Sequence, residues 1–127
     1  MLHLRMIYDE ILKNSVFANS RPGRTDARVI LILALLLKYK RLRRKMILFL
    51  IQHIDPCIQE TGSMGQRTVK TCIERGWIKM QEQRGARKKG LYSITQAGKK
   101  HLYELINEYF QGETVQNMVS VLDTYAA

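Results

Sequence analysis

An uninterrupted run of nine apolar residues, Val29–Leu37, constrains the fold of this chain more than any other feature of its sequence. A membrane-spanning helix needs about 20 such residues, so the run is too short to cross a bilayer. The longer segment from Asp26 to about Tyr39 is apolar nearly all round rather than along one stripe. Because a helix of that kind is stable only when it is buried on most sides, we expect it to lie in the core of a soluble helical fold.

The composition is that of one globular domain. The chain has 127 residues, of which 46% are hydrophobic and 25% charged, and these values are typical of a single soluble unit. We expect an N-terminal helix and loop (1–25), a core (26–111) and a C-terminal helix (112–127). The two cysteines, Cys57 and Cys72, are too few for a disulfide framework. They favour reduced, buried thiols in a cytoplasmic protein.

Charge is distributed unevenly along the chain. There are 21 Lys and Arg against 11 Asp and Glu, a net charge of +10, and every basic residue precedes residue 101. The remaining segment carries only acids, which are Glu104, Glu108, Glu113 and Asp123. A basic body with an acidic tail indicates that the body binds a polyanion. Duplex DNA, RNA and an anionic membrane are the alternatives, and the scarcity of stacking aromatic residues disfavours RNA.

Helices are also expected at both ends of the chain. Leu2–Asn14 and Glu113–Tyr125 place apolar residues at helical spacing. These residues are Leu4, Ile7, Tyr8, Ile11 and Leu12 in the first segment, and Val115, Met118, Val119, Leu122 and Tyr125 in the last. The stretch Ala18–Arg24 is predicted to be a loop, with Thr25 capping the helix that follows. The sequence leaves open whether residues 26–54 form one long helix or two with a break near residue 40.

The middle of the chain predicts a helix-turn-helix unit. A short helix is expected over Pro56–Thr61, because Asp-Pro is a common helix start. A turn over Gly62–Gly65 follows, and then a second helix over Gln66–Arg75 that ends at Gly76. We call this second helix the reading helix, because a helix in such a unit can enter the major groove of DNA.

A β-hairpin and a further helix are predicted after the reading helix. Apolar residues alternate with a period of two in WIKMQEQ and again in LYSIT, and the polar loop Arg84–Gly90 joins the two strands. Thr95 is expected to cap a helix from Gln96 to about Gln111. Its apolar face is expected to hold Ala97, His101 or Leu102, Leu105 or Ile106, and Tyr109.

Three groups of residues are candidates for contacts with DNA. In the reading helix, Val69, Cys72 and Ile73 should pack inward, which leaves a polar face for bases and phosphates: Gln66, Arg67, Thr68, Lys70 and Thr71. The hairpin tip, or wing, holds Arg84, Arg87, Lys88 and Lys89, which repel one another unless a phosphate neutralises them. In the basic run from Lys38 to Lys45, the residues Arg43, Arg44 and Lys45 either contact the DNA backbone or form a solvated helix junction. A solvated surface is the alternative for all three groups.

The stretch from Thr61 through LYSITQAGKKHL resembles the winged helix-turn-helix core of the PadR and MarR repressor families, over about residues 44–105. The end of the reading helix is matched by Ile73, Gly76, Trp77 and Ile78, and the close of the wing by Tyr92, Ile94, Thr95 and Gly98. The turn is one residue longer than in those families, and Cys57-Ile58 replaces the usual Leu-Ala pair. The resemblance implies a homodimer formed by terminal helices. It therefore assigns dimerisation to Leu4, Ile7, Ile11, Val115, Met118, Val119 and Leu122.

The sequence thus predicts a mainly α fold with a small β-hairpin (α+β), a winged helix-turn-helix with extra terminal helices. We expect it to bind double-stranded DNA as a homodimer and to regulate transcription as a repressor. The alternatives are a plasmid or phage partition or replication protein, and a winged-helix protein-interaction module that does not bind DNA. No metal-ligand spacing, phosphate loop or nucleophile motif is present. We therefore expect no enzyme activity, cofactor, metal or membrane partner, and an effector of unknown chemistry is left open.

Overall fold

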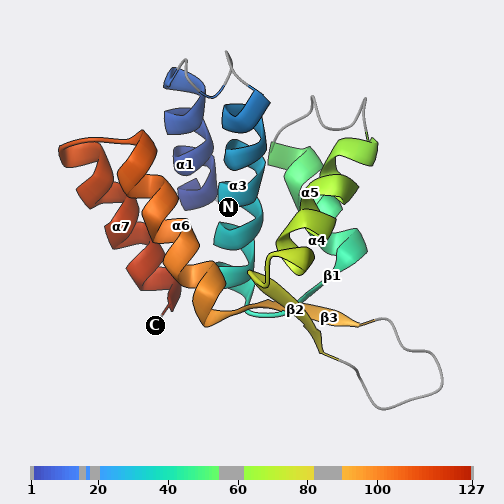
Figure 1. Ribbon diagram of the computed structural model, residues 1–127. Coiled ribbons are helices and arrows are strands. Elements are labelled where there is room, and N and C mark those ends of the chain that lie inside the picture. The colour runs from blue at the N-terminus through green and yellow to red at the C-terminus, as the bar shows by residue number, and fades with distance from the viewer. Residues whose placement is uncertain (1, 15–16, 18–20, 55–61, 82–89, 127) are drawn as a thin grey trace.

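The computed structural model describes residues 2–14, 17, 21–54, 62–81 and 90–126. Within these ranges the chain is mainly helical, as the sequence predicted, and one small three-stranded antiparallel sheet stands where a two-stranded hairpin was expected (Figure 1). In order, the elements are α1 (Leu2–Lys13), α3 (Arg21–Tyr39), β1 (Leu42–Arg43), α4 (Arg44–Ile54), α5 (Gly62–Glu74), β2 (Ile78–Gln81), β3 (Leu91–Ile94), α6 (Gln96–Tyr109) and α7 (Glu113–Ala126).

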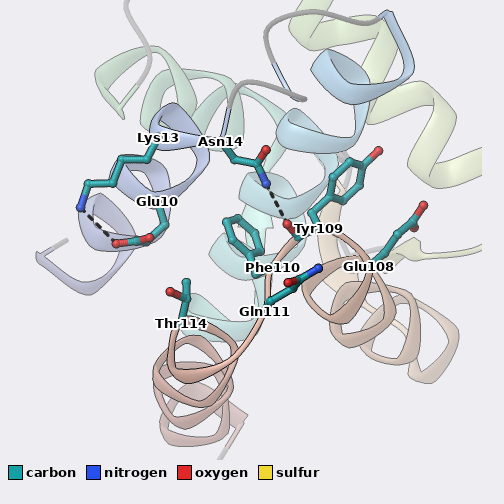
Figure 2. Close-up of a pocket in the computed structure, with 8 residues that line it drawn as sticks. All are labelled: Glu10, Lys13, Asn14, Glu108, Tyr109, Phe110, Gln111 and Thr114. Atoms are coloured by element: carbon teal, nitrogen blue, oxygen red, sulfur yellow. Dashed lines mark hydrogen bonds and ion pairs between the residues drawn. The ribbon is translucent and has the colours of Figure 1, made fainter.

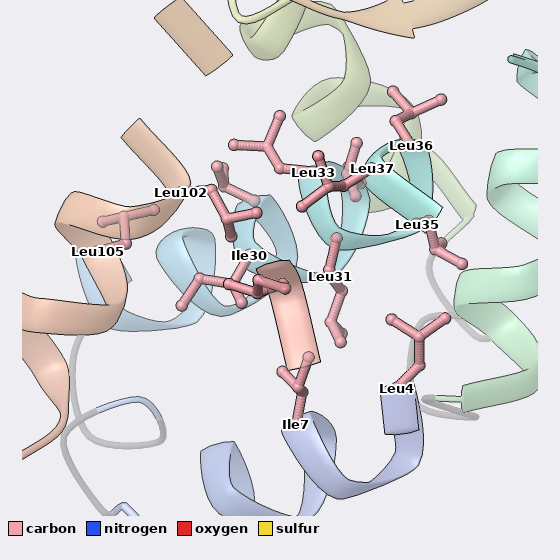
Figure 3. Packing of buried hydrophobic residues seen from close by; sticks show 14 of the residues in the cluster. Leu4, Ile7, Ile30, Leu31, Leu33, Leu35, Leu36, Leu37, Leu102 and Leu105 are labelled. Carbon is pink, nitrogen blue, oxygen red and sulfur yellow. The ribbon is translucent and has the colours of Figure 1, made fainter. Parts of the chain in front are cut away.

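Helix α3 is the centre of the fold. Every residue of Val29–Leu37 is at most 1% exposed, so this prediction is confirmed. Helices α1, α4, α5, α6 and α7 and strand β3 all contact α3. In Figure 1, α6 and α7 lie on one side of it and α4 and α5 on the other. Figure 3 shows leucine and isoleucine side chains of α1, α3 and α6 meeting in this core.

The start of α3 differs from the prediction. The helix begins at Arg21, so the described part of the expected loop, Arg21–Arg24, is helical and Thr25 is not its N-cap. Pro22 is tolerated because the N–H groups of a first turn have no acceptor within the helix. A tertiary contact also holds this end, since the Tyr109 hydroxyl of α6 donates a hydrogen bond to Asp26.

Residues 26–54 form two helices, with the break at Lys40. Lys40 has a φ of 69°, in the left-handed region, and its N–H donates to the Leu36 carbonyl at 3.0 Å. The Lys40 ammonium group donates to the backbone carbonyl of Tyr125 in the last turn of α7. A cation at the carbonyl end of a helix is favourable. The Lys40 side chain therefore links the C-terminal end of α3 to α7.

Strand β3 lies in the middle of the sheet, between β1 and β2. Leu42 pairs with Tyr92 on one side of it, and Ile78 pairs with Ile94 on the other. Strands β2 and β3 are the predicted hairpin. Strand β1 was not predicted, because two residues carry no detectable alternation.

Helix α5 begins four residues earlier than predicted. Gly62–Gly65, expected to be a turn, is its first helical turn. Gly65 is buried, as are Val69 and Cys72 further along the helix. Packing on this shared face therefore outweighs the local preference of glycine for a turn. The short helix expected over Pro56–Thr61 lies outside the described residues.

Local hydrogen bonds at the end of α5 and at the start of α6 explain the sequence motifs there. Gly76 has a φ of 74°, its N–H donates to Ile73 O at 3.1 Å, and the Trp77 N–H donates to Cys72 O at 2.9 Å. This pair of bonds is a Schellman motif, which requires a residue that tolerates positive φ. Thr95 caps α6 as predicted, since its hydroxyl accepts from the Gly98 N–H at 3.0 Å.

The buried face of α6 is shifted by one residue from the prediction. Ala97 is exposed, and the buried residues are Gly98, Leu102, Leu105 and Ile106. His101 is half-buried and stacks on Trp77, with ring centroids 3.8 Å apart. The shift arises because the N-terminus of α6 packs against the backbone of Trp77, which places Gly98 rather than Ala97 at the contact.

The terminal helices occupy the predicted segments. In α1, Leu4, Ile7 and Ile11 are buried, whereas Leu12 is 61% exposed, contrary to the expected face. In α7 the buried residues are Met118, Leu122 and Tyr125. Both helices pack on α3 and belong to the same hydrophobic cluster as α5 and α6.

Candidate nucleic-acid interface

The outward face of α5 is polar and cationic. Gln66, Arg67 and Lys70 are exposed, whereas Val69 and Cys72 are completely buried. The Nζ atom of Lys70 lies 3.9 Å from Oε1 of Glu74. This exposed ion pair contributes little to stability. Three of the five side chains that the sequence placed outward are therefore accessible to a partner.

Two residues of α5 lie elsewhere than predicted. Thr68 is 4% exposed and lies on the buried face, so it is not accessible to DNA. Ile73, expected to be inward, is 37% exposed. The buried stripe is centred between Val69 and Cys72, which leaves Ile73 at the rim of the outward face.

The remaining candidate on α5, Thr71, is half-buried. Its hydroxyl donates to the Arg67 carbonyl at 3.0 Å, four residues earlier in the helix.

The neighbouring Cys72 is a buried thiol as predicted, and burial raises its pKa to about 12. This thiol is therefore protonated at neutral pH and is a poor nucleophile. Cys57 lies outside the described residues.

The basic run from Lys38 to Lys45 divides into two groups. Lys38 lies over the rings of Tyr39 and Tyr125, at 5.3 and 5.4 Å from their centroids, and Lys40 donates to Tyr125. These two cations are therefore held by the chain's own C-terminal helix. The second group consists of Arg43, Arg44 and Lys45.

Arg43, Arg44 and Lys45 are all exposed at the junction of β1 and α4. With Met46, Gly90 and Tyr92 they line a hollow of about 350 Å³. Within the described ranges none of the three forms an ion pair. The positive end of the α4 dipole lies at the same place, so the hollow is suited to an anion.

Strand pairing adds Lys79, a residue that the sequence analysis did not select. Lys79 pairs with Ser93 and Arg43 pairs with Leu91. Leu91 and Ser93 are two residues apart on β3, so both cations lie on the same face of the sheet, one on each side of β3. The signal was present in the alternation of Lys79 with the apolar residues Ile78 and Met80.

The wing tip was the second group of predicted DNA contacts. Arg84, Arg87, Lys88 and Lys89 lie outside the described residues. The base of the hairpin is described, and it closes with Gln81 paired to Leu91. Lys79 lies on β2, the strand that this closing pair joins to β3.

No family model, curated protein or solved structure matches this chain. The resemblance to the PadR and MarR repressors thus stays an inference from the motifs around Gly76 and Thr95. No helix in the described ranges is long and apolar enough to span a membrane. Those ranges also contain no group of three His, Cys, Asp or Glu side chains that could hold a metal ion.

The residues assigned to dimerisation are mostly covered by the chain itself. Leu4, Ile7, Ile11, Met118 and Leu122 are at most 4% exposed in the single chain. They pack in the core with α3. Val115 and Val119 are half-buried. In the single chain those five residues belong to the core, and the assignment of dimerisation to the terminal helices stays a prediction.

A second hollow, of about 740 Å³, lies between α1 and the turn from α6 to α7 (Figure 2). At this hollow, the side-chain amide of Asn14 donates a hydrogen bond to the backbone carbonyl of Tyr109 at 2.7 Å. Glu10 and Lys13 form an ion pair at 3.4 Å on its wall, and Glu108 adds another carboxylate. Its mixed charge is unsuited to a polyanion, so it is not part of the basic surface.

Proposed function

We propose that the protein is a winged helix-turn-helix protein that binds duplex DNA, with α5 as its reading helix. The observation that carries this proposal is the division of α5 between a buried side, with Val69 and Cys72, and an exposed side, with Gln66, Arg67 and Lys70. The order α3, β1, α4, α5, β2, β3, with β3 between β1 and β2, supports it. This is the arrangement in which a hairpin flanks a reading helix.

The chemistry of the exposed side chains fits a duplex. The major groove is about 12 Å wide and admits an α-helix. Arg67 and Gln66 can form paired hydrogen bonds with base edges, and Lys70 can contact a phosphate. Arg43, Arg44, Lys45 and Lys79 then provide a second cationic area for the DNA backbone, where each phosphate contact releases counterions.

The acidic residues of the C-terminal segment lie on the other side of the molecule. Glu104, Glu108, Glu113 and Asp123 are exposed on α6 and α7, which Figure 1 shows across α3 from α4 and α5. Repulsion of this side by phosphates favours approach with α4 and α5 facing the DNA. We further propose that the protein acts as a dimeric transcriptional regulator.

The test is selection of bound fragments from random duplex DNA, followed by affinity measurements with the selected sequence. Arg67→Ala should weaken binding by about 1–3 kcal/mol and relax the preference at one position. Arg5→Ala, which removes the same charge from α1, is the matched control and should bind like the parent. Parent-like binding by Arg67→Ala would reject α5 as the reading helix.

The same experiment separates the other functions. One short palindromic footprint indicates a regulator, and an extended array of repeats indicates a partition or replication protein. A lack of affinity for any DNA at low ionic strength would contradict the proposal and favour a protein-interaction module.

A further inference from the structure

The outward face of α5 carries one acid among its cations. Glu74 is exposed and is the last residue of the helix. At about 100° per residue, it lies between Lys70 and Arg67 around the helix, about 40° from the first and about 20° from the second. This position is nearly opposite Val69 and Cys72, which are completely buried. The carboxylate is therefore at the middle of the surface that would face DNA.

The helix itself does not favour an acid at this position. The C-terminal end of a helix dipole is negative, so a carboxylate in the last turn is unfavourable. The last turn of α5 is described in full and holds no basic residue. Lys70 pairs with Glu74 from four residues earlier, but the order Lys before Glu is the weaker one and the pair is exposed. The stability of α5 therefore does not account for Glu74.

Glu74 also differs in charge from the surface around it. It is the only acid in residues 40–54, 62–81 and 90–100, the described ranges that hold α4, α5, the sheet and the start of α6. Phosphates repel a carboxylate at this place. An acid here therefore weakens binding to every duplex unless it accepts a hydrogen bond in the complex.

Cytosine presents the base edge that suits a carboxylate in the major groove. Its N4 amino group is a donor, whereas guanine and thymine present acceptors, at N7 and O6 or at O4. Adenine has a donor at N6, but its N7 acceptor lies beside that donor and repels a carboxylate. Lys70 can leave Glu74 for a phosphate, since the exposed pair contributes little. The carboxylate is then unpaired unless a base donates to it.

We propose that Glu74 is a specificity-determining residue, whose carboxylate accepts a hydrogen bond from the N4 amino group of a cytosine. In the complex, Lys70 moves from Glu74 to a phosphate. Glu74 follows Arg67 by seven residues, about 10 Å along the helix at 1.5 Å per residue. That distance corresponds to about three base pairs, so Glu74 and Arg67 read different positions. This inference rests on the proposed function, because it needs α5 to enter the groove.

The test is selection of bound fragments from random duplex DNA with the parent, Glu74→Ala and Glu74→Gln. At one position the parent should prefer cytosine over thymine by on the order of tenfold. This position should lie about three base pairs from the one that Arg67→Ala relaxes. Glu74→Ala should lose the preference and bind non-specific DNA at least as tightly as the parent, because a repulsive charge is gone. Glu74→Gln should shift the preference to adenine, because an amide can bond both N6 and N7.

Glu104→Ala is the matched control, because Glu104 forms the same kind of exposed pair with Lys100, at 4.0 Å between Nζ and Oε1, on α6. This variant should keep every base preference of the parent. Unchanged preferences in Glu74→Ala would overturn this inference, whether or not its overall affinity changes, and would leave α5 as the reading helix. A parent that binds no duplex at low ionic strength would instead overturn the proposed function, and this inference with it.

Discussion

The backbone carbonyl oxygen of Trp77 lies 2.1 Å from the point that a Cβ atom on Gly98 would occupy. This contact locks the start of α6 against the end of α5, together with the Thr95 hydroxyl, which lies 3.0 Å from the same carbonyl. The geometry gives a physical reason for glycine at the close of the wing motif. A side chain there would separate the two helices.

We predict that Gly98→Ala destabilises the protein by about 2 kcal/mol, because the clash with backbone outweighs the better helix propensity of alanine. Urea unfolding followed by circular dichroism measures this change. Lys100→Ala, at an exposed position of the same helix, is the control and should stay within about 0.5 kcal/mol of the parent. Equal stabilities of the parent and Gly98→Ala would show that α6 can move away from Trp77 at no cost.

A second prediction compares two tyrosines that donate to carboxylates. Tyr109 donates to Asp26 in a partly buried site that joins α6 to α3, whereas Tyr103 donates to Asp123 at an exposed site, at 2.7 Å. Tyr109→Phe should cost about 1.5–3 kcal/mol, and Tyr103→Phe about 0.5–1 kcal/mol, because solvent replaces an exposed bond more readily. Thermal unfolding of the two variants side by side tests this order, and the reverse order would contradict it.

The pH dependence of stability should reveal the buried thiol. Burial raises the pKa of Cys72 from 9.0 to about 12, so above pH 9 the unfolded chain releases a proton that the folded chain keeps. Stability therefore falls between pH 9 and 12, by up to about 1.4 kcal/mol per pH unit for this group. Tyr103, whose pKa burial raises to about 12, adds to the fall.

Cys72→Ala in a Cys57→Ser background isolates the thiol. The variant is less stable at neutral pH because it leaves a cavity. Its free energy of unfolding should then decline less steeply above pH 9 than that of Cys57→Ser alone. Parallel curves over pH 9–12 would show that the thiol titrates alike in both states.

The salt dependence of DNA binding should distinguish the two halves of the basic run. Arg43→Ala should flatten the slope of log affinity against log salt by about one unit, because it removes one phosphate contact. Lys38→Ala is the matched control and should leave the slope unchanged, since Lys38 lies over the Tyr39 and Tyr125 rings. A change of slope with Lys38→Ala but not with Arg43→Ala would contradict the assignment of Arg43, rather than Lys38, to the DNA-facing surface.

Lys88→Ala, in the wing, should weaken binding to all sequences alike and flatten the slope of log affinity against log salt by a similar amount.

Local signals in the sequence predicted the elements that short-range chemistry determines. Thr95 begins a helix because its hydroxyl accepts an N–H of the first turn, and Gly76 ends one because it tolerates positive φ. The burial of Val29–Leu37 was equally predictable, since no other arrangement removes so many apolar side chains from water. These features need no knowledge of distant residues.

The remaining features depend on tertiary contacts that spacing does not reveal. Gly65 reads as a turn residue until its burial beside Val69 is known, and Thr68 reads as a groove contact until the orientation of α5 is fixed. Helical spacing correctly showed that Leu4 and Leu122 lie on apolar faces. Spacing does not say whether such a face is covered by the same chain or by another copy.

The central position of α3 has a consequence for truncation and for folding. Helices from both ends of the chain pack on it, and so does α5. A fragment limited to residues 44–95 would lose the leucines that α5 packs against, and a chain without α7 would expose others to water. The protein should therefore unfold in one cooperative transition, and the rigidity of α5, the proposed reading helix, depends on helices from both ends of the chain.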